Sequence, residues 1–503
     1  MPQVELAGQM VRRPVRAERR SSRSERLRVC GLFGVVALIC AFFDTCLPAR
    51  AGLALAALLY LVWAVWLTKM EAISAPLKLN PLVLYQLWQA ATLGVAPLYV
   101  AGTNLGGASI PLGNQNVPLE WVAYGHAVMV IGSWAFYVGM KQFAPHSTAR
   151  GLARPSPVSP LFLVAAAAIG SVFLAAREAV TQYVGSTVAQ LSILPTAVLC
   201  LVALKPRSAR EHSDNRRFCI LLFGSLGLMA LNSRRDSKME LILSFFPLVW
   251  WLVIRRKRGL MLLAAPALAA FYVLAVAPLV SATRNDKSAR DDTGGVSVLN
   301  AGSTQQIIAG MRENWTAGPG RYAWNWLDIT MLRTCDPVAA GLVASLAERD
   351  GFQFGSGLDY VPLSFIPRAV WPGKPSVNPG VTFSTMLGMV SASGSVYTCT
   401  GTTAAGELYW NFGWPGALLG MYLLGAAVAG LWWRAAGADP RQGLFEMTAY
   451  TGAMLSFVLG TGAAAGPLLT TCVSAGIIWR LLVGFRRKLL AGKAAAMGAR
   501  VYA

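Results

Sequence analysis

Long apolar runs separated by short polar links dominate this chain. A helix needs about 20 apolar residues to cross the hydrocarbon core of a membrane, and runs of about that length recur along the sequence. Twelve such runs are predicted as transmembrane helices, at about 29–48, 51–68, 79–100, 119–140, 159–176, 187–204, 218–232, 239–254, 259–280, 409–433, 443–465 and 466–485. The pattern therefore predicts an all-α polytopic membrane protein.

The polar stretches divide the chain around these runs. Residues 1–28 form a basic arm and 486–503 a basic tail, while helices 1 to 9 occupy 29–280 and helices 10 to 12 occupy 409–485. Residues 281–408 are the one long hydrophilic segment left. The first run follows a polar arm and no convincing cleavage site comes after it, so we interpret it as a retained helix.

Composition and charge support this interpretation and orient the chain. Hydrophobic residues make up 55% of the 503 residues and charged ones 13%, and the mean hydropathy is +0.49. Most Lys and Arg fall in loops that are cytoplasmic if both termini are inside, as the positive-inside rule requires. The net charge of +21 then reflects this bias and attraction to anionic membrane lipids, and we expect no nucleic-acid partner.

One outward-facing link breaks the charge pattern. The stretch "LNSRRDSKMELIL", at 231–243, carries Arg234 and Arg235 just before Ser237 and Glu240, which form an S-x-x-E capping box. A helix N-terminus beside two arginines favours anions. The alternative is that these cations reach the lipid headgroups or pair with neighbouring carboxylates.

The long segment 281–408 is predicted to be a large external loop with short helices, which is periplasmic if the membrane is the inner membrane of a bacterium. "CDPVAAGLVASLAERDG" predicts a helix with Asp336 as N-cap, Pro337 at its first position and Gly351 as its stop. "FQFGSGLDYVPLSFIPRAVWPGKPSVNPG" is too rich in Gly and Pro for one helix and predicts a shaped loop. Cys335 and Cys399 both lie in this segment. We expect them either to form a disulfide or to remain two free thiols.

The inventory of chemical groups is narrow. No HExxH, GxSxG or P-loop motif occurs, and the cysteines lack metal-ligand spacing, so we expect no metal or other cofactor. His126 lies in a predicted span, where a satisfied polar contact between helices is its expected role. What faces outward is mainly arginines and carboxylates. A guanidinium holds a diphosphate bidentately and can stabilise it as a leaving group without a metal.

Three motifs in order resemble one family. "RRDSKMELIL", then "FIPRAVWPGKP", then "GTTAAGELYWNFGWPGALLGMYLLG" look like the Wzy-type O-antigen polymerases and related oligosaccharide repeat-unit polymerases. The motif resemblance covers about 225–435. It implies a multi-pass protein of the bacterial inner membrane, with a GT-C-like architecture and a metal-independent glycosyltransferase activity at the periplasmic face. A chain-length regulator and a flippase of the same pathway would be its partners.

The implied reaction joins lipid-linked repeat units into a surface polysaccharide such as O-antigen, capsule or exopolysaccharide. An acceptor hydroxyl attacks a glycan on undecaprenyl diphosphate, and undecaprenyl diphosphate leaves. Glu407 and Asp359, with Asp236 third, are the candidates to orient or deprotonate the acceptor. The expected diphosphate- and substrate-binding residues are Arg234, Arg235, Arg368, Arg284, Arg290, Lys374 and Trp371.

Several alternatives stay open. Glu407 precedes a predicted span and would equally serve as a helix cap, and Arg368 with Trp371 would equally brace a loop. A ligase for finished glycans differs only in its acceptor. Related ligases use a loop histidine, and the outward loops here have none. A flippase for lipid-linked glycans would place charge within its spans, where this chain has chiefly Asp44 and Glu446.

Overall fold

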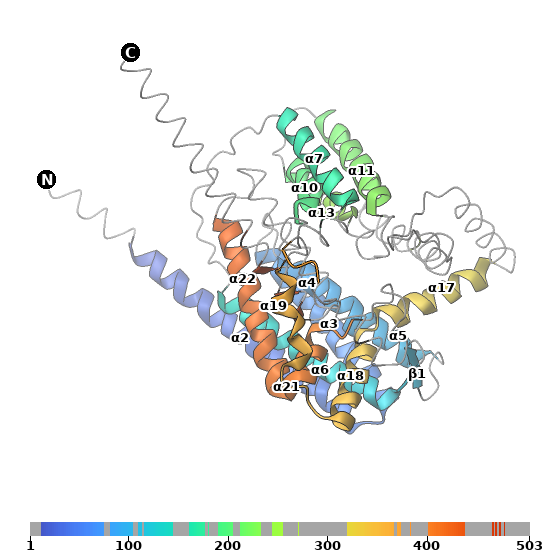
Figure 1. Ribbon diagram of the computed structural model, residues 1–503. Helices are drawn as coiled ribbons and strands as arrows, with labels where there is room; N and C mark the ends of the chain where they lie inside the picture. Colours follow the sequence, from blue (N-terminus) through green and yellow to red (C-terminus); the bar gives the residue numbers. More distant parts are fainter. Residues whose placement is uncertain are drawn as a thin grey trace, which may run out of the picture.

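The computed structural model describes eleven stretches of the chain and a few isolated residues. The stretches are 12–74, 81–103, 109–112, 115–143, 160–176, 190–204, 212–232, 244–254, 319–366, 370–373 and 401–437. Within them the protein is almost entirely helical, as predicted (Figure 1). The one sheet in this part is a hairpin of β1 (Ser109–Leu112) and β2 (Gln115–Pro118), paired antiparallel with Ile110 opposite Val117.

Several helices are suited to a membrane. Four in the described residues are long and apolar enough to cross one, and a fifth candidate is a bent pair, Leu327–Thr334 with Asp336–Asp350. Large apolar side chains such as Leu38, Phe42 and Val62 point outward and are mostly exposed. Lipid contact accounts for such faces. The predicted spans at 259–280 and 443–465, and most of 466–485, lie outside the described residues.

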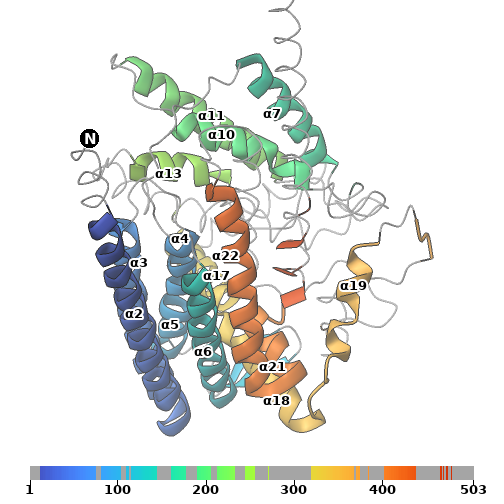
Figure 2. The same ribbon diagram turned by 90° about the vertical axis from the view of Figure 1, so that its left-hand side faces the viewer.

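The main bundle gathers helices from both ends of the sequence around one apolar core (Figure 2). Its N-terminal members are α2 (Arg12–Cys46), α3 (Ala49–Ser74), α4 (Pro81–Gln89), η1 (Ala90–Val95), α5 (Ala96–Gly102) and α6 (Leu119–Phe143). The later members are α17 (Pro319–Thr334), α18 (Asp336–Asp350), α21 (Ala404–Pro415), η8 (Gly416–Gly420) and α22 (Met421–Gly437). The predicted run 79–100 is thus interrupted by η1, a π-helical turn.

Helix α6 lies at the centre because glycines let its neighbours approach closely. Gly125, Gly132 and Gly139 are seven residues apart and so share one face. A Cβ on Gly125 would collide with the backbone of Gly341 in α18, one on Gly132 would meet Ala405 in α21, and one on Gly139 would collide with α22. Small residues of this kind bring helix backbones together in membranes.

Helix α18 differs from the expectation for its segment. Its predicted limits are nearly right, since it begins at Asp336, ends before Gly351 and has Cys335 as N-cap rather than Asp336. Instead of lying in a loop apart from the spans, it packs along α6 with Val338, Val343 and Ala344 buried in the main core. Helix α18 and the end of α17 therefore belong to the bundle. Cys335 is a buried free thiol, and Cys399 lies outside the described residues.

A smaller group of helices packs separately. Its members are α7 (Pro160–Ala175), η4 (Gln190–Ile193), α10 (Leu194–Leu204), α11 (His212–Asn232) and α13 (Phe246–Ile254). Ala203, Leu221 and Trp251 are central to one of its two small cores. In both views these helices lie together (Figures 1 and 2). α7 and α10 are each shorter than a full span, at 16 and 11 residues.

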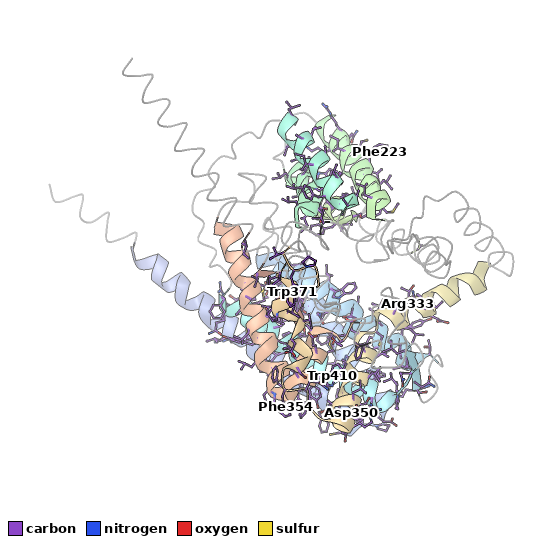
Figure 3. All side chains as sticks on the ribbon, viewed as in Figure 1. Phe223, Arg333, Asp350, Phe354, Trp371 and Trp410 are labelled. Atoms are coloured by element: carbon purple, nitrogen blue, oxygen red, sulfur yellow. The ribbon has the colours of Figure 1, made fainter. Side chains whose placement is uncertain are left out.

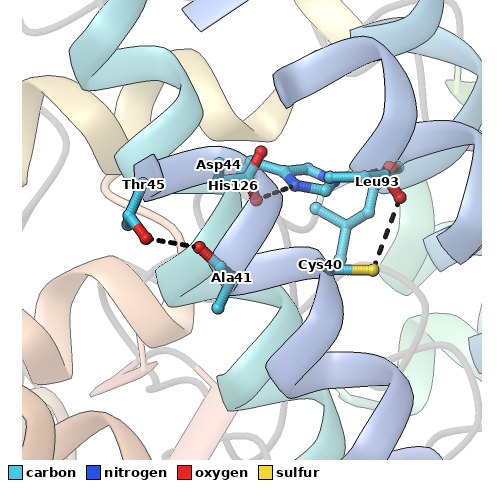
Figure 4. Close-up of polar contacts among 7 residues, drawn as sticks. Cys40, Ala41, Asp44, Thr45, Leu93 and His126 are labelled. Carbon is cyan, nitrogen blue, oxygen red and sulfur yellow. Dashed lines mark hydrogen bonds and ion pairs between the residues drawn. The ribbon is translucent and has the colours of Figure 1, made fainter. Parts of the chain in front are cut away.

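Buried polar groups tie α2, η1 and α6 together. His126 Nδ1 lies 2.7 Å from Asp44 Oδ2 and Nε2 lies 2.8 Å from the Leu93 carbonyl oxygen (Figure 4). Since a carbonyl only accepts, Nε2 donates to Leu93, and one further proton lies between Nδ1 and Asp44. The expected role of His126 as a satisfied contact between helices is confirmed. Farther along α6, Lys141 pairs with Glu71 of α3.

The close approach of α6 and α18 predicts opposite outcomes for two Gly→Ala variants. In a helix, alanine is normally favoured over glycine by about 1 kcal/mol. At Gly341 the added Cβ would collide with the backbone at Trp121, so we expect Gly341→Ala to destabilise the protein by about 1–3 kcal/mol. At Gly227 of α11 no atom lies within 4 Å of the added carbon, so Gly227→Ala should be neutral or stabilising.

Thermal unfolding of the purified variants in one detergent measures both effects. A lower melting temperature for Gly341→Ala beside an unchanged or higher one for Gly227→Ala is expected. Equal behaviour of the two variants would show that α6 and α18 do not pack backbone to backbone.

Candidate functional site

Helix α21 begins with a tight local structure that places Glu407 inward. Thr403 is its N-cap, with its hydroxyl accepting a hydrogen bond from Gly406 N at 3.1 Å. Its φ of 62° is in the left-handed region, which β-branched residues rarely adopt. The helix starts at Ala404, five residues before the predicted span at 409. Glu407 is therefore one turn inside the helix and 3% exposed.

The Glu407 carboxylate joins three separate parts of the chain. Tyr360 of α19 (Tyr360–Ser364) donates its hydroxyl to Oε1 at 2.9 Å, and the Gly466 backbone N–H donates to Oε2 at 3.1 Å. A Cβ on Gly466 would collide with the Tyr360 ring and hydroxyl, so a larger residue there would displace the tyrosine from Glu407. Both carboxylate oxygens of Glu407 therefore accept hydrogen bonds from outside its own helix, whose N-cap is Thr403.

Tyr360 is held as a hydrogen-bond donor. Burial raises the pKa of its hydroxyl well above the usual value, and the neighbouring Glu407 charge and hydrogen bond raise the pKa further. The hydroxyl therefore keeps its proton at any physiological pH. Because Tyr360 is only half-buried while Glu407 is buried, the tyrosine forms the more accessible end of this pair.

Asn411, one turn after Glu407, fastens the loop that leads to Tyr360. Its Oδ1 accepts from the N–H groups of Gly355 and Gly357, both at 3.2 Å, and its Nδ2 donates to the Glu407 carbonyl at 2.8 Å. The loop amide of Gln353 also donates to Trp410 O at 3.0 Å. One side chain thereby fixes the loop to the same helix that carries Glu407.

A break follows directly in α21. Gly413 has φ 64° and ψ −152°, a region that is essentially limited to glycine. Phe352 packs over it, since an added Cβ would come within 3.1 Å of the Phe352 ring. Pro415 ends α21 and is the N-cap of the π-helical turn η8. The carboxylate therefore lies on a short helical piece before an interruption, a form that often borders sites in membrane proteins.

An aromatic cluster covers the opposite face of the same piece. The hydroxyls of Tyr124 (α6) and Tyr409 (α21) lie 2.9 Å apart. Trp414 contacts both rings edge to face, and Phe352 contacts Tyr409 in the same way. Since residues 407 and 409 are about 200° apart on a helix, this cluster anchors α21 to α6 and leaves Glu407 on the side of Tyr360.

The structure places three of the predicted site residues. Glu407 is at the centre just described, and Asp359, next to Tyr360, is exposed and makes no capping hydrogen bond. Trp371 is 42% exposed and lies apart from Phe354 and Trp410 (Figure 3). The remaining predicted residues, namely Arg234, Arg235, Asp236, Arg284, Arg290, Arg368 and Lys374, lie outside the described residues, as does the capping box of the 231–243 link.

Sequence reasoning missed Tyr360, Thr403 and Asn411. Tyr360 follows a candidate that was named, Asp359, in "GLDYVP", and Asn411 is part of the "NFG" motif. The available pattern was a polar residue one turn after a candidate carboxylate, with a glycine two residues later. In the part of the chain that is described, no group of three His, Cys, Asp or Glu side chains could hold a metal ion.

Comparison of the chain with protein-family models, with curated proteins and with solved structures found no match in any of the three.

Replacing Asn411 tests whether it fastens the loop. Asn411→Ala removes all three hydrogen bonds, whereas Asn411→Asp keeps an acceptor for the two glycine amides and loses only the donor to Glu407. At about 0.5–1.5 kcal/mol per bond, hydrogen exchange at Gly355 and Gly357 should accelerate about tenfold or more in the alanine variant. The aspartate variant should remain nearer the wild type. Equal protection in all three proteins would contradict this role.

Proposed function

We propose that this chain is a membrane glycosyltransferase that polymerises undecaprenyl-diphosphate-linked oligosaccharide repeat units at the periplasmic face of a bacterial inner membrane. The observation that carries the proposal is the buried Glu407 carboxylate, oriented by Tyr360 and Gly466 within the "GELYWNFG" motif of the family resemblance. The apolar helices around it support a membrane-embedded protein.

In this proposal Tyr360 and Glu407 act together on the acceptor. The acceptor hydroxyl gives its proton to the Tyr360 oxygen as Tyr360 gives its own to Glu407, so that no free tyrosinate forms. The acceptor oxygen then bonds to the anomeric carbon of the donor glycan, and the bond from that carbon to the diphosphate oxygen breaks. A relay of this kind suits a buried base whose partner is the more accessible group.

The leaving diphosphate takes the bonding electrons and needs positive charge. Arg234, Arg235 and Arg368, with Arg284, Arg290 and Lys374, are proposed to supply it, because guanidinium groups bind phosphate oxygens bidentately. Trp371 would stack on a sugar ring or on a guanidinium. Asp359, exposed beside Tyr360, is the second carboxylate in reach of an acceptor, and Asp236 is the third candidate.

A transporter or flippase for lipid-linked glycans is the second candidate. The observation in its favour is that ionisable pairs do lie inside the helices of the bundle, namely Asp44 with His126 and Lys141 with Glu71. Against it, Asp44 and His126 are fully enclosed by packed helices, so they do not line a substrate path in this conformation. A ligase for finished glycans shares the chemistry and differs in its acceptor.

Glu407→Gln and Tyr360→Phe test the proposed relay in a strain that lacks the chromosomal gene. We expect both variants to abolish long polysaccharide chains on a glycan gel while single repeat units accumulate on the lipid carrier. Glu348→Gln, which removes an exposed carboxylate from α18, is the matched control and should restore full-length chains.

Membrane levels of each variant must be equal on an immunoblot for this comparison. Arg234→Ala and Arg235→Ala should match the Glu407→Gln profile if they bind the diphosphate. Normal chain lengths from Glu407→Gln and Tyr360→Phe would refute the relay. Intact chains left on the carrier in the gene deletion would indicate a ligase, and units retained on the inner face would indicate a flippase.

A further inference from the structure

A partly buried carboxylate at the start of α18 has no counter-ion among the residues that the structure describes. Asp44 shares a proton with His126, and Glu71 is paired with Lys141. Asp336, at the start of α18, makes no ion pair among the described residues, and its Oδ2 is shielded from solvent without a hydrogen-bond partner. A lone carboxylate among apolar helices is costly unless a cation or a proton neutralises it.

The π-helical turn η1, which packs against α18, and the residue just before this turn carry side-chain oxygens without partners. Thr92 of η1 lies beside the Asp336 carboxylate and is fully buried, yet its hydroxyl lacks a well-formed hydrogen bond. Gln89, one turn earlier, is 1% exposed and its Oε1 has no partner. Buried polar atoms are usually satisfied in native proteins, and a bound cation would satisfy these oxygens.

The local backbone also suits an ion. Asp336 and Thr92 meet where the π-helical turn η1 interrupts a span, and π-helical turns occur frequently at functional sites. Interrupted helices in membrane proteins use freed carbonyls and side-chain oxygens to coordinate Na⁺ or H⁺. The next residue, Leu93, already directs its carbonyl to His126.

We propose that Asp336, Thr92 and Gln89 form a binding site for a monovalent cation, Na⁺ or H⁺, inside the bundle. Either cation would neutralise the Asp336 carboxylate, and the melting-temperature experiment below distinguishes between the two. The site is distinct from the Glu407 centre and does not depend on the proposed polymerase activity. It joins α18 to η1 and so couples cation binding to the packing of the interrupted span.

The pH effects of other titratable groups near this site have to be distinguished from the pH effect of Asp336. They are the adjacent Cys335 thiol, the Asp44–His126 pair beyond Leu93, Arg333 in α17, and Tyr124 and Glu407 on the helices that pack against α18. Among the titratable groups in the described part of the chain, Asp336 is the one that interacts with the Thr92 hydroxyl. A pH effect that Asp336→Asn removes is therefore assigned to this carboxylate.

The test is the melting temperature of the full-length protein in detergent. NaCl is compared with choline chloride at equal ionic strength, at mildly acid and mildly alkaline pH, for the wild type, Asp336→Asn and Thr92→Val. Asp350→Asn is the control, because Asp350 is at the exposed end of the same helix and pairs with Arg349. Asparagine resembles the neutralised carboxyl in shape and should fold without a cation.

A sodium site predicts a saturable rise of several degrees with NaCl at alkaline pH in the wild type and in Asp350→Asn. Asp336→Asn should show none of this rise, and Thr92→Val should need several times more NaCl. A proton site predicts no sodium effect but a higher melting temperature on acidification, again absent in Asp336→Asn. If the wild type responds to neither ion, or responds no differently from Asp336→Asn, the site does not exist.

Discussion

The close backbone contact of α6 with its neighbours is the constraint on which the rest of the structure depends. Gly125, Gly132 and Gly139 form one face of α6, and α18, α21 and α22 lie against them with no room for a Cβ. In lipid there is no strong hydrophobic force between helices, so close van der Waals contact must hold them together. This contact brings α18, α21 and α22 to helices near the N-terminus.

The positions of the proposed functional groups depend on that contact. With α21 fixed to α6 by Ala405 at Gly132 and by the Tyr124–Tyr409 hydroxyl pair, its other face is left to Glu407. The same packing brings the N-terminal turn of α18 against η1, where Asp336 meets Thr92. Both carboxylates lie close to irregular backbone, Glu407 before the break at Gly413 of its own helix and Asp336 against the π-helical turn η1. Irregular backbone in such a core supplies polar groups that regular helices do not.

The sequence predicted where the helices lie along the chain better than it predicted which helices pack against each other. Apolar run length located α2, α3 and α6 to within a few residues at most ends, except that α2 begins well before its run. The Asp-Pro start and Gly351 stop located α18. Hydropathy did not reveal that α18 packs into the bundle, because its surroundings in sequence are polar and its Gly341 contact is formed with a residue far away in the chain. The π-helical turn was equally hidden, since "AATLGV" reads as ordinary apolar helix.

The candidate site was predicted only in part, for a similar reason. Glu407 was found because it follows small residues in a recognisable motif, but its partners Tyr360 and Gly466 are distant in sequence and a single chain gives no sign of such pairing. Arg368, Lys374 and the arginines before residue 300 remain predictions from charge and order alone. Their proposed role depends on phosphate chemistry.

The most direct measurement of the central claim uses the purified protein with its proposed substrate alone. The chain is reconstituted in lipid nanodiscs with undecaprenyl-diphosphate-linked repeat units, and the glycan products and released undecaprenyl diphosphate are measured together. The account predicts a ladder of polymers and one undecaprenyl diphosphate released for each linkage formed, with neither in Glu407→Gln. Repeat units that remain single and carrier-bound with the wild-type protein, under conditions in which it is folded, would contradict the account.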